Sequence, residues 1–227
     1  MTGSMSSKLS FPSVNFSPIR LSLLLAGMLF GGAVSQLRAA DSLLPDGGFE
    51  NGIAGWKAFI PEESKDKNCR FEIISDSPHS GTNCVRLQSD DFARFSIGTG
   101  LLPVQAGERY RVSVWIKADA GAQVRANATG FVIRLGLRQG DADAEGGHLF
   151  ISSGNRVTRS IPADPASALP KQWTQLEAVI EIPPGVDAMG PSLFSWWTSG
   201  TIVADDFSIE KVDATTPLTP VWTKGAP

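Results

Sequence analysis

Apolar and polar residues alternate with a period of two along much of this chain, which is the pattern of half-buried β-strands. The clearest runs are residues 109–117 (RYRVSVWIK), 131–138 (FVIRLGLR) and 174–182 (TQLEAVIEI). Shorter runs predict further strands at residues 70–74, 84–88, 92–97, 148–152, 156–161, 193–197 and 201–212. The three clearest runs place mostly apolar side chains on one face and mostly polar side chains on the other, and Trp115 and Val179 stand on the polar faces.

Gly, Pro, Asp, Asn and Ser cluster between these runs, as in SDSPHSGTN and IPPGVDAMGPS, and such clusters predict turns. No helical period of useful length and no internal repeat is present after residue 40. Many short strands joined by polar turns indicate an all-β fold, an antiparallel β-sandwich or jelly roll of a single domain over residues 41–212. We expect residues 43–56 to contain the first strand with Phe49 buried, and residues 213–227, rich in Pro and Thr, to form a flexible tail.

The N-terminal forty residues have the pattern of a secretory signal peptide. Lys8 and Arg20 precede an apolar run of 14 residues, 21–34 (LSLLLAGMLFGGAV), and small residues follow it. Cleavage after Ser35 or Ala40 would leave no membrane segment, and the run is shorter than the ~20 residues of a membrane span. An uncleaved membrane anchor is the alternative. The signal predicts an extracytoplasmic location: secreted, or in the periplasm or at the cell surface if the source is bacterial.

Charge and cysteine content narrow the function classes. The whole chain has a formal charge of -3, and removal of residues 1–40 removes three basic side chains and no acid, which leaves 17 basic against 23 acidic side chains, or -6. This balance argues against a nucleic-acid partner, because phosphates require clustered Lys and Arg. Cys69 and Cys84 are the two cysteines, and an oxidising compartment predicts a disulfide between them.

Catalytic patterns are weak. The two histidines, His79 and His148, stand apart from any serine in a GxSxG context, which argues against Ser–His hydrolysis. Glycoside hydrolysis needs only two carboxylates at a suitable separation, so a glycan-active hydrolase or its accessory subunit remains an alternative. Residues 140–152 (GDADAEGGHLFIS) match only the first half of a calcium-binding EF-hand loop, and an acidic hairpin tip explains them better.

Acidic residues at the two ends of the domain indicate a hard cation. The alternation in residues 201–212 (TIVADDFSIEKV) predicts that Asp205 shares an apolar face with Val203, Phe207 and Ile209, and an acid facing a core requires a partner. Glu50 follows Phe49 at the other end of the domain. If the terminal strands are neighbours, both acids could bind one ion, and calcium suits carboxylate ligands better than zinc does. Two unrelated surface acids are the alternative.

Five motifs in order resemble the CenC-like carbohydrate-binding modules, the grouping of families 4, 9, 16 and 22. They are Gly47-Gly48-Phe49-Glu50 with Gly55-Trp56, His79-Ser80-Gly81 with Val85-Arg86-Leu87, Gly107-Glu108-Arg109-Tyr110 with residues 113–117, Trp173, and residues 205–209. The resemblance covers about residues 43–212. It implies a galactose-binding-like jelly roll with a structural calcium near the first strand. Glu50, Asp205, Asp206 and Asn83 occupy the positions expected to hold that ion.

A sugar site combines aromatic rings, which stack on a pyranose, with polar side chains that bond its hydroxyls. The alternation predicts that such residues lie on the outward faces of the strands. The candidates are Trp115, Arg111, Lys117, Arg134, Arg138, Gln175, Glu177 and Trp197. We therefore predict an exported, non-catalytic protein that binds an extracellular polysaccharide or glycan. A calcium-stabilised structural module that binds another extracellular protein and no sugar is the main alternative.

Overall fold

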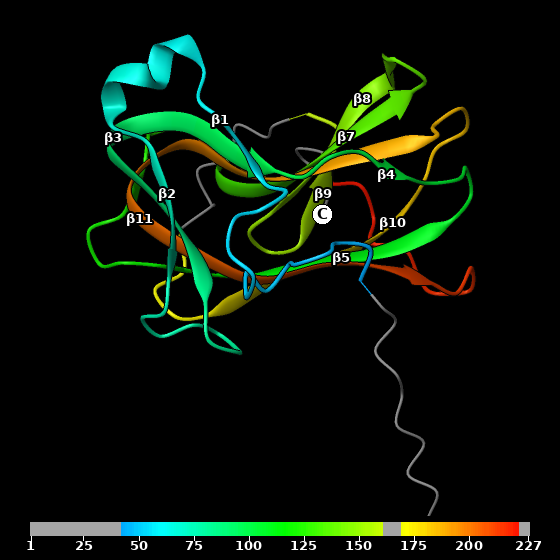
Figure 1. The fold of residues 1–227 in the computed structure, drawn as a ribbon. Coiled ribbons are helices and arrows are strands. Elements are labelled where there is room, and N and C mark those ends of the chain that lie inside the picture. Colours follow the sequence, from blue (N-terminus) through cyan, green and yellow to red (C-terminus); the bar gives the residue numbers. More distant parts are fainter. Residues whose placement is uncertain (1–41, 161–168, 223–227) are drawn as a thin grey trace, which may run out of the picture. The chain divides into compact units, whose positions relative to one another are not determined.

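The computed structural model describes residues 42–160 and 169–222 (Figure 1). All of the described residues belong to one compact unit of the chain. The signal peptide predicted for residues 1–40 lies outside the described residues. Within the described ranges, no helix is long and apolar enough to cross a membrane.

The described residues form an almost purely β structure, as predicted. Its one short 3-10 helix, η1 (Glu62–Lys67), was not expected. The strands are β1 (Lys57–Phe59), β2 (Arg70–Ile74), β3 (Cys84–Gly98), β4 (Leu102–Pro103), β5 (Arg109–Ala118), β6 (Gln123–Val124), β7 (Gly130–Gln139), β8 (Ala142–Ser152), β9 (Arg156–Thr158), β10 (Thr174–Glu181) and β11 (Ala188–Val212). All strand pairs in the described parts are antiparallel. This confirms the predicted all-β antiparallel fold.

Two layers arise because β3 and β11 are long enough to take part in both (Figure 1). Residues 188–196 of β11 pair with β7 and with the end of β3. This gives sheet one, with the order β9-β8-β7-β11-β3-β1. Residues 202–212 of β11 pair with β5, and residues 202–204 also pair with the start of β3. This gives sheet two, with the order β10-β5-β11-β3-β2.

The crossing from one sheet to the other is built into the backbone of β11. Its register with β3 shifts between Trp196 and Gly200, where Trp197 has φ 58° and Gly200 has φ 85°. A Cβ atom on Gly200 would lie 2.7 Å from the Cα atom of Ala122, so only glycine fits there without a shift. The sequence pattern predicted separate strands before and after this bend, at residues 84–88 and 92–97 and at residues 193–197 and 201–212, whereas β3 and β11 each continue through it.

The alternating residues of both sheets fill the core. Tyr110, Val112, Val114 and Ile116 of β5 are buried, as are Phe131, Ile133 and Leu135 of β7, and this agrees with the predicted faces. The hairpin of β7 and β8 turns at Gly140–Asp141, which confirms the hairpin tip expected there. Such alternation is the direct result of a strand with one face against an apolar layer.

The N-terminal segment corrects one expectation. Residues 43–56 form turns rather than a strand, because Phe49 adopts φ 59° and Gly52 and Gly55 adopt φ 86°. Phe49 is nevertheless fully buried, as expected, and its ring lies 4.9 Å from that of Trp56. The segment docks on β11 through a hydrogen bond from Phe207 N to Gly47 O of 2.9 Å.

The expectation of a flexible tail is also corrected for the residues that the structure describes. Thr219 N donates to Val179 O over 2.9 Å, and Trp222 N donates to Val157 O over 2.7 Å. Residues 213–222 therefore lie against β9 and β10. The remaining tail residues lie outside the described ranges.

The predicted disulfide is wrong. Both thiols are free, and Cys84 is buried. The β2–β3 register places Arg70 opposite Gln88 and Ile74 opposite Cys84, so Cys69 lies level with Ser89 of β3. Five strand residues correspond to about 17 Å, whereas a disulfide joins Cα atoms that are roughly 6 Å apart. A separation of fourteen residues permits a bridge in sequence, but the hairpin register forbids it.

Thiol titration tests this register. The native protein should expose one slowly reacting thiol, Cys69, and denaturation should release a second, because burial raises the pKa of the Cys84 thiol to about 11 and the thiolate is the reactive form. Detection of no thiol in the unreduced, denatured protein would show that a disulfide exists and that the register is wrong.

Glycine at position 47 is required by the docking of the N-terminal turns. A Cβ atom there would lie 1.7 Å from the backbone oxygen of Phe207, whereas the nearest atom to a Cβ on Gly48 is 3.8 Å away. Gly47→Ala should therefore cost about 2 kcal/mol or more in urea unfolding, as steric overpacking does. Gly48→Ala is the matched control and should cost well under ~1 kcal/mol. Equal effects of the two substitutions would contradict this docking.

Candidate functional site

The structure divides the predicted sugar-binding residues between the two outer faces of the sandwich. Those on β5 and β10 share the outer face of sheet two, where Gln175 pairs with Trp115 and Glu177 pairs with Ser113. Arg111 lies 3.9 Å from carboxylate oxygens of both Glu177 and Glu210. The Nζ atom of Lys117 lies 5.0 Å from the ring centroid of Trp173. The cations of this face thus already have partners within the protein.

A loop covers the predicted platform Trp115. Residues 75–83 connect β2 to β3, and His79 in this loop stacks on Trp115 with ring centroids 3.9 Å apart and planes at 14°. Trp173 meets the His79 ring edge-on at 5.6 Å. Imidazole therefore occupies the ring face that a sugar would need.

Asp205 lies beneath this loop, and its position corrects the predicted face. A bulge between Asp205 and Ser208 adds one residue to β11, and Asp206 adopts φ 49° there. The bulge shifts the alternation, so that Phe207 and Ile209 face the core while Asp205 shares the face of its partner Trp115. Asp205 is still fully buried, because the loop covers it from outside.

Backbone N–H groups satisfy the Asp205 carboxylate. Its Oδ2 atom accepts from His79 N at 2.8 Å and from Ser80 N at 3.1 Å, and its Oδ1 atom accepts from Asp206 N at 2.7 Å. Burial raises the pKa of this carboxyl group, although the same N–H bonds act in the opposite direction. Asp206 adds bonds to His79 Nδ1 and to Ser80 Oγ, each of 2.7 Å. The bulge and the loop are therefore joined by two adjacent acids.

Glu50 holds the other end of the same loop. Its Oε1 atom accepts from Thr82 N at 2.8 Å and from Asn83 N at 3.1 Å, and Asn83 Nδ2 donates to the Glu50 carbonyl at 3.3 Å. A Cβ atom on Gly81 would lie 2.1 Å from Glu50 Oε1. The predicted calcium residues Glu50, Asp205 and Asp206 thus contact the 75–83 loop, to which Asn83 itself belongs, and these contacts explain why the four residues lie close together.

The donor chemistry of this arrangement differs from a calcium shell. Calcium is bound by six to eight oxygen atoms, whereas Asp205 and Glu50 Oε1 face N–H groups in this loop conformation. Across the described ranges, no group of three or more His, Cys, Asp or Glu residues is arranged to hold a metal ion. Calcium at these residues would require the loop to turn oxygens toward them.

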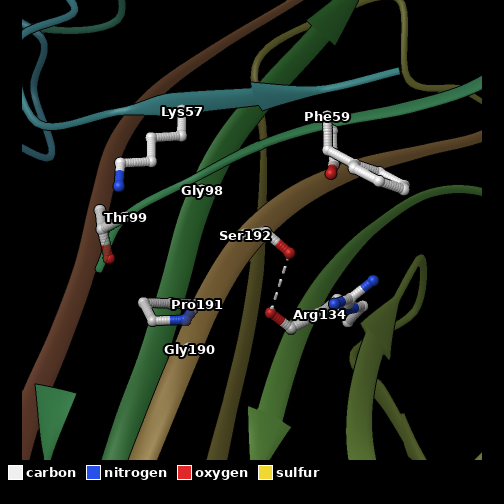
Figure 2. A pocket seen from close by; sticks show the side chains of 9 residues that line it. Lys57, Phe59, Gly98, Thr99, Arg134, Gly190, Pro191 and Ser192 are labelled. Atoms are coloured by element: carbon white, nitrogen blue, oxygen red, sulfur yellow. Dashed lines mark hydrogen bonds between the residues drawn. The ribbon is translucent and has the colours of Figure 1, made fainter. Parts of the chain in front are cut away.

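The outer face of sheet one is open and hollowed. A cavity of about 310 Å³ is lined by residues of β1, β3, β7 and β11, among them Lys57, Phe59, Arg134 and Ser192. Figure 2 shows Lys57 and Phe59 on β1, Arg134 across the cavity on β7, and Gly98 and Ser192 between them. A second cavity of about 240 Å³ shares Phe59 and Arg134 and adds Arg94, His148, Phe150, Phe194 and Trp196. We call the two cavities together the aromatic groove.

The strand register explains why this face is concave. One cross-strand row reads Lys57, Gly98, Ser192, Arg134 and Phe150, and the neighbouring row reads Phe59, Ser96, Phe194 and Val132. Residues paired across a sheet lie on the same face. Small residues therefore stand in the middle of the first row, and large ones stand at its ends.

Aromatic side chains form the base of the groove. Val132, Phe150 and Phe194 make a small apolar cluster separate from the main core, with Trp196 packed against it. The rings of Phe194 and Trp196 meet edge-on at 5.2 Å. Phe59 is 58% exposed at the rim. The groove thus offers both a buried apolar floor and an accessible ring.

Cations line this groove. Arg94 lies over Trp196 at 4.8 Å, and Arg134 lies over Phe194 at 5.7 Å. Arg94 also pairs with Glu63, and Arg138, beyond the groove on the same face of β7, pairs with Asp143. Burial and the charge of Arg134 lower the pKa of His148, against a smaller opposing effect of Asp143.

Sequence reasoning placed Arg134 and Arg138 correctly on an outward face but missed the aromatic residues beside them. Phe59, Phe150, Phe194 and Trp196 stand in segments with apolar residues at adjacent positions, such as LFI and LFSWW, where the alternation that marks one exposed face is lost. A run that is apolar on both faces is the available sign of a second apolar surface. Trp197 lies at the bend of β11, 4.9 Å from the guanidinium of Arg125.

Three structures illustrate what the fold is similar to. The enzymatically active domain of tailspike protein 4 from bacteriophage CBA120 has 11% identity and a TM-score of 0.55, with 75% of this chain and 21% of that chain covered. This chain therefore spans about a fifth of the tailspike chain. A family 61 carbohydrate-binding module in complex with β-1,4-galactotriose has 15% identity and a TM-score of 0.47 (76% and 100% covered). A family 22 xylan-binding domain from Paenibacillus barcinonensis has 17% identity and a TM-score of 0.48 (77% and 97% covered).

No curated protein matches the chain. In the sequence comparison with protein families, residues 41–132 match the family described as "Carbohydrate binding domain". This part contains Phe59 and Arg94, while Arg134, Phe150, Phe194 and Trp196 follow it. The family match confirms the predicted resemblance to carbohydrate-binding modules over residues 41–132, which contain the first three of the five motifs; Trp173 and residues 205–209 follow the matched part.

Proposed function

We propose that this protein binds carbohydrate through the aromatic groove on the outer face of sheet one. The observation that carries the proposal is the combination of an exposed ring, Phe59, with a hollow of small residues and polar side chains around it. The match of residues 41–132 to a carbohydrate-binding domain family supports the same function.

Sugar recognition has two physical parts, and the groove supplies both. The C–H face of a pyranose is apolar and packs on aromatic rings, while its hydroxyls need hydrogen-bonding partners at the edge. Phe59 and Trp196 provide rings, and Ser96, Ser192 and the guanidinium groups provide polar partners. Trp115, by contrast, has its ring face against His79. The proposed sugar platform is therefore sheet one and not the β5–β10 face.

We propose a binding role without catalysis, in an exported protein. Aromatic, cationic and small residues make up the groove lining, a composition suited to holding a ligand. The signal-peptide pattern of residues 1–40 supports export. The calcium predicted for Glu50 and Asp205 also stays a prediction.

Substitution of Phe59 tests sugar binding. Because this side chain is mostly exposed, Phe59→Ala should leave the melting temperature nearly unchanged and should weaken glycan binding by about tenfold, the loss of one stacking ring. The measurement is affinity electrophoresis against polysaccharides selected on a glycan array. Leu218→Ala, another partly exposed apolar residue, is the control and should bind as the unchanged protein does.

Two results would contradict this proposal. Retention of no polysaccharide by the unchanged protein would favour the alternative of a protein-interaction module. Equal weakening by Phe59→Ala and Leu218→Ala would remove the groove as the site.

Chelation tests the calcium prediction. An ion bound only by the native state stabilises it by mass action, so a resident calcium predicts that a chelator lowers the melting temperature and that added Ca²⁺ restores it. The Asp205→Asn variant should then lose this response. A melting temperature that is the same with and without the chelator would leave N–H groups as the partners of these carboxylates.

A further inference from the structure

The charge of the aromatic groove runs against the charge of the whole chain. The protein has a formal charge of -3, yet the titratable side chains that line the groove are Lys57, Arg94, Arg134 and His148. The nearest acids act from its margin: Glu63 pairs with Arg94, and Asp143 pairs with Arg138 while still acting on Arg134 at a distance. A neutral glycan requires no such concentration of cations.

Arg134 is a cation of the groove that has no carboxylate partner in the described residues. Several other arginines of the described residues have a carboxylate partner: Arg109 binds Glu181 at 2.9 Å, and Arg86 binds Glu72 at 3.1 Å. In the same described ranges, no acceptor is recorded for the guanidinium of Arg134; its Nε atom is buried without a hydrogen-bond partner, as are the Nε atoms of Arg94 and Arg138. The two Nη groups of Arg134 are not among the buried atoms, and no acceptor in the described residues bonds them, so an acceptor supplied from outside can reach them.

The environment of Arg134 strengthens its demand for an anion. Its guanidinium lies over the Phe194 ring, and burial lowers the pKa of the group, because removal from water disfavours the charged form. An anion placed beside it would reverse that effect. The two Nη groups together form a planar fork, which matches the two oxygens of a carboxylate.

The position of Arg134 in the groove indicates that the anion it binds is part of a sugar. Arg134 and Phe59 line both cavities, so the fork and the exposed ring face the same space. Lys57 stands at the far end of the Arg134 row, with Gly98 and Ser192 between them. Three strand spacings separate the two cations, about 14 Å. A chain of linked sugars can therefore meet one cation at each end of that row.

We propose that the ligand of the groove is a uronic-acid-containing polysaccharide whose carboxylate is bound by Arg134. This inference rests on the proposed function, since it names the glycan class for the same groove. The pyranose ring packs on Phe59. Lys57 and Arg94 bind the carboxylates of neighbouring sugar units of the polysaccharide.

The test compares ligands that differ only in charge. Polygalacturonate and its fully methyl-esterified form share one backbone, so their comparison by affinity electrophoresis isolates the carboxylate. The unchanged protein should bind the acid form at least tenfold more tightly. Arg134→Gln should remove most of that preference, while Arg138→Gln, on the same face of β7 but paired with Asp143, should keep it.

Further variants keep the test decisive. Arg134→Lys retains the charge without the fork and should recover only part of the preference. If Arg134→Gln fails to fold, the exposed Lys57→Gln should still reduce binding of the acid form several-fold. Weakening of acid-form binding by Arg138→Gln as strong as by Arg134→Gln would overturn the assignment to Arg134.

Each ligand outcome separates the two proposals. Binding of the acid and ester forms with equal affinity would overturn the uronate inference and leave carbohydrate binding intact. Equal binding of dextran sulfate and polygalacturonate would show general anion attraction and also overturn it. If the protein bound none of these ligands and neither neutral xylan nor neutral galactan, both proposals would be overturned.

Discussion

The antiparallel pairing of β3 with β11 is the constraint on which the rest of the structure depends. Both strands bend from one layer into the other, and they remain paired on either side of the bend. Every other strand except β8, β9 and β10 then pairs directly with one of these two. The backbone geometry of Trp197 and Gly200 at the crossing therefore fixes where sheet one ends and sheet two begins.

This division gives the two outer faces different chemistry. On sheet two, a bulge at Asp206 brings Asp205 outward beneath the 75–83 loop, where backbone N–H groups and the His79–Trp115 stack hold the loop down. On the outer face of sheet one, small residues stand in the middle of a cross-strand row and leave a hollow there. The outer face of sheet two therefore has buried polar groups under a loop, whereas the outer face of sheet one has an accessible hollow.

Local alternation was sufficient to predict β5, β7 and β10, because each has one face on the core and one face outside. It could not distinguish a bend within a strand from a turn between two strands at residues 89–91 and 198–200, since both segments are polar and both interrupt the period. Asp205 was assigned to the wrong face for a related reason: a one-residue bulge inverts the alternation. Such bulges depend on contacts with a distant loop.

The sequence pattern could not predict the candidate site for a different reason. Arg134 and Arg138 share one face by their spacing, yet only the structure separates them: Arg138 reaches Asp143 across the β7–β8 hairpin, whereas Arg134 points over Phe194. The side chain four residues nearer the hairpin turn meets an acid, and the one farther along meets an aromatic ring. The same residue type thus serves hairpin stability at one position. At position 134, the Nη donors face a hollow whose shape comes from glycine and serine on neighbouring strands. An acceptor from outside the protein can reach them there.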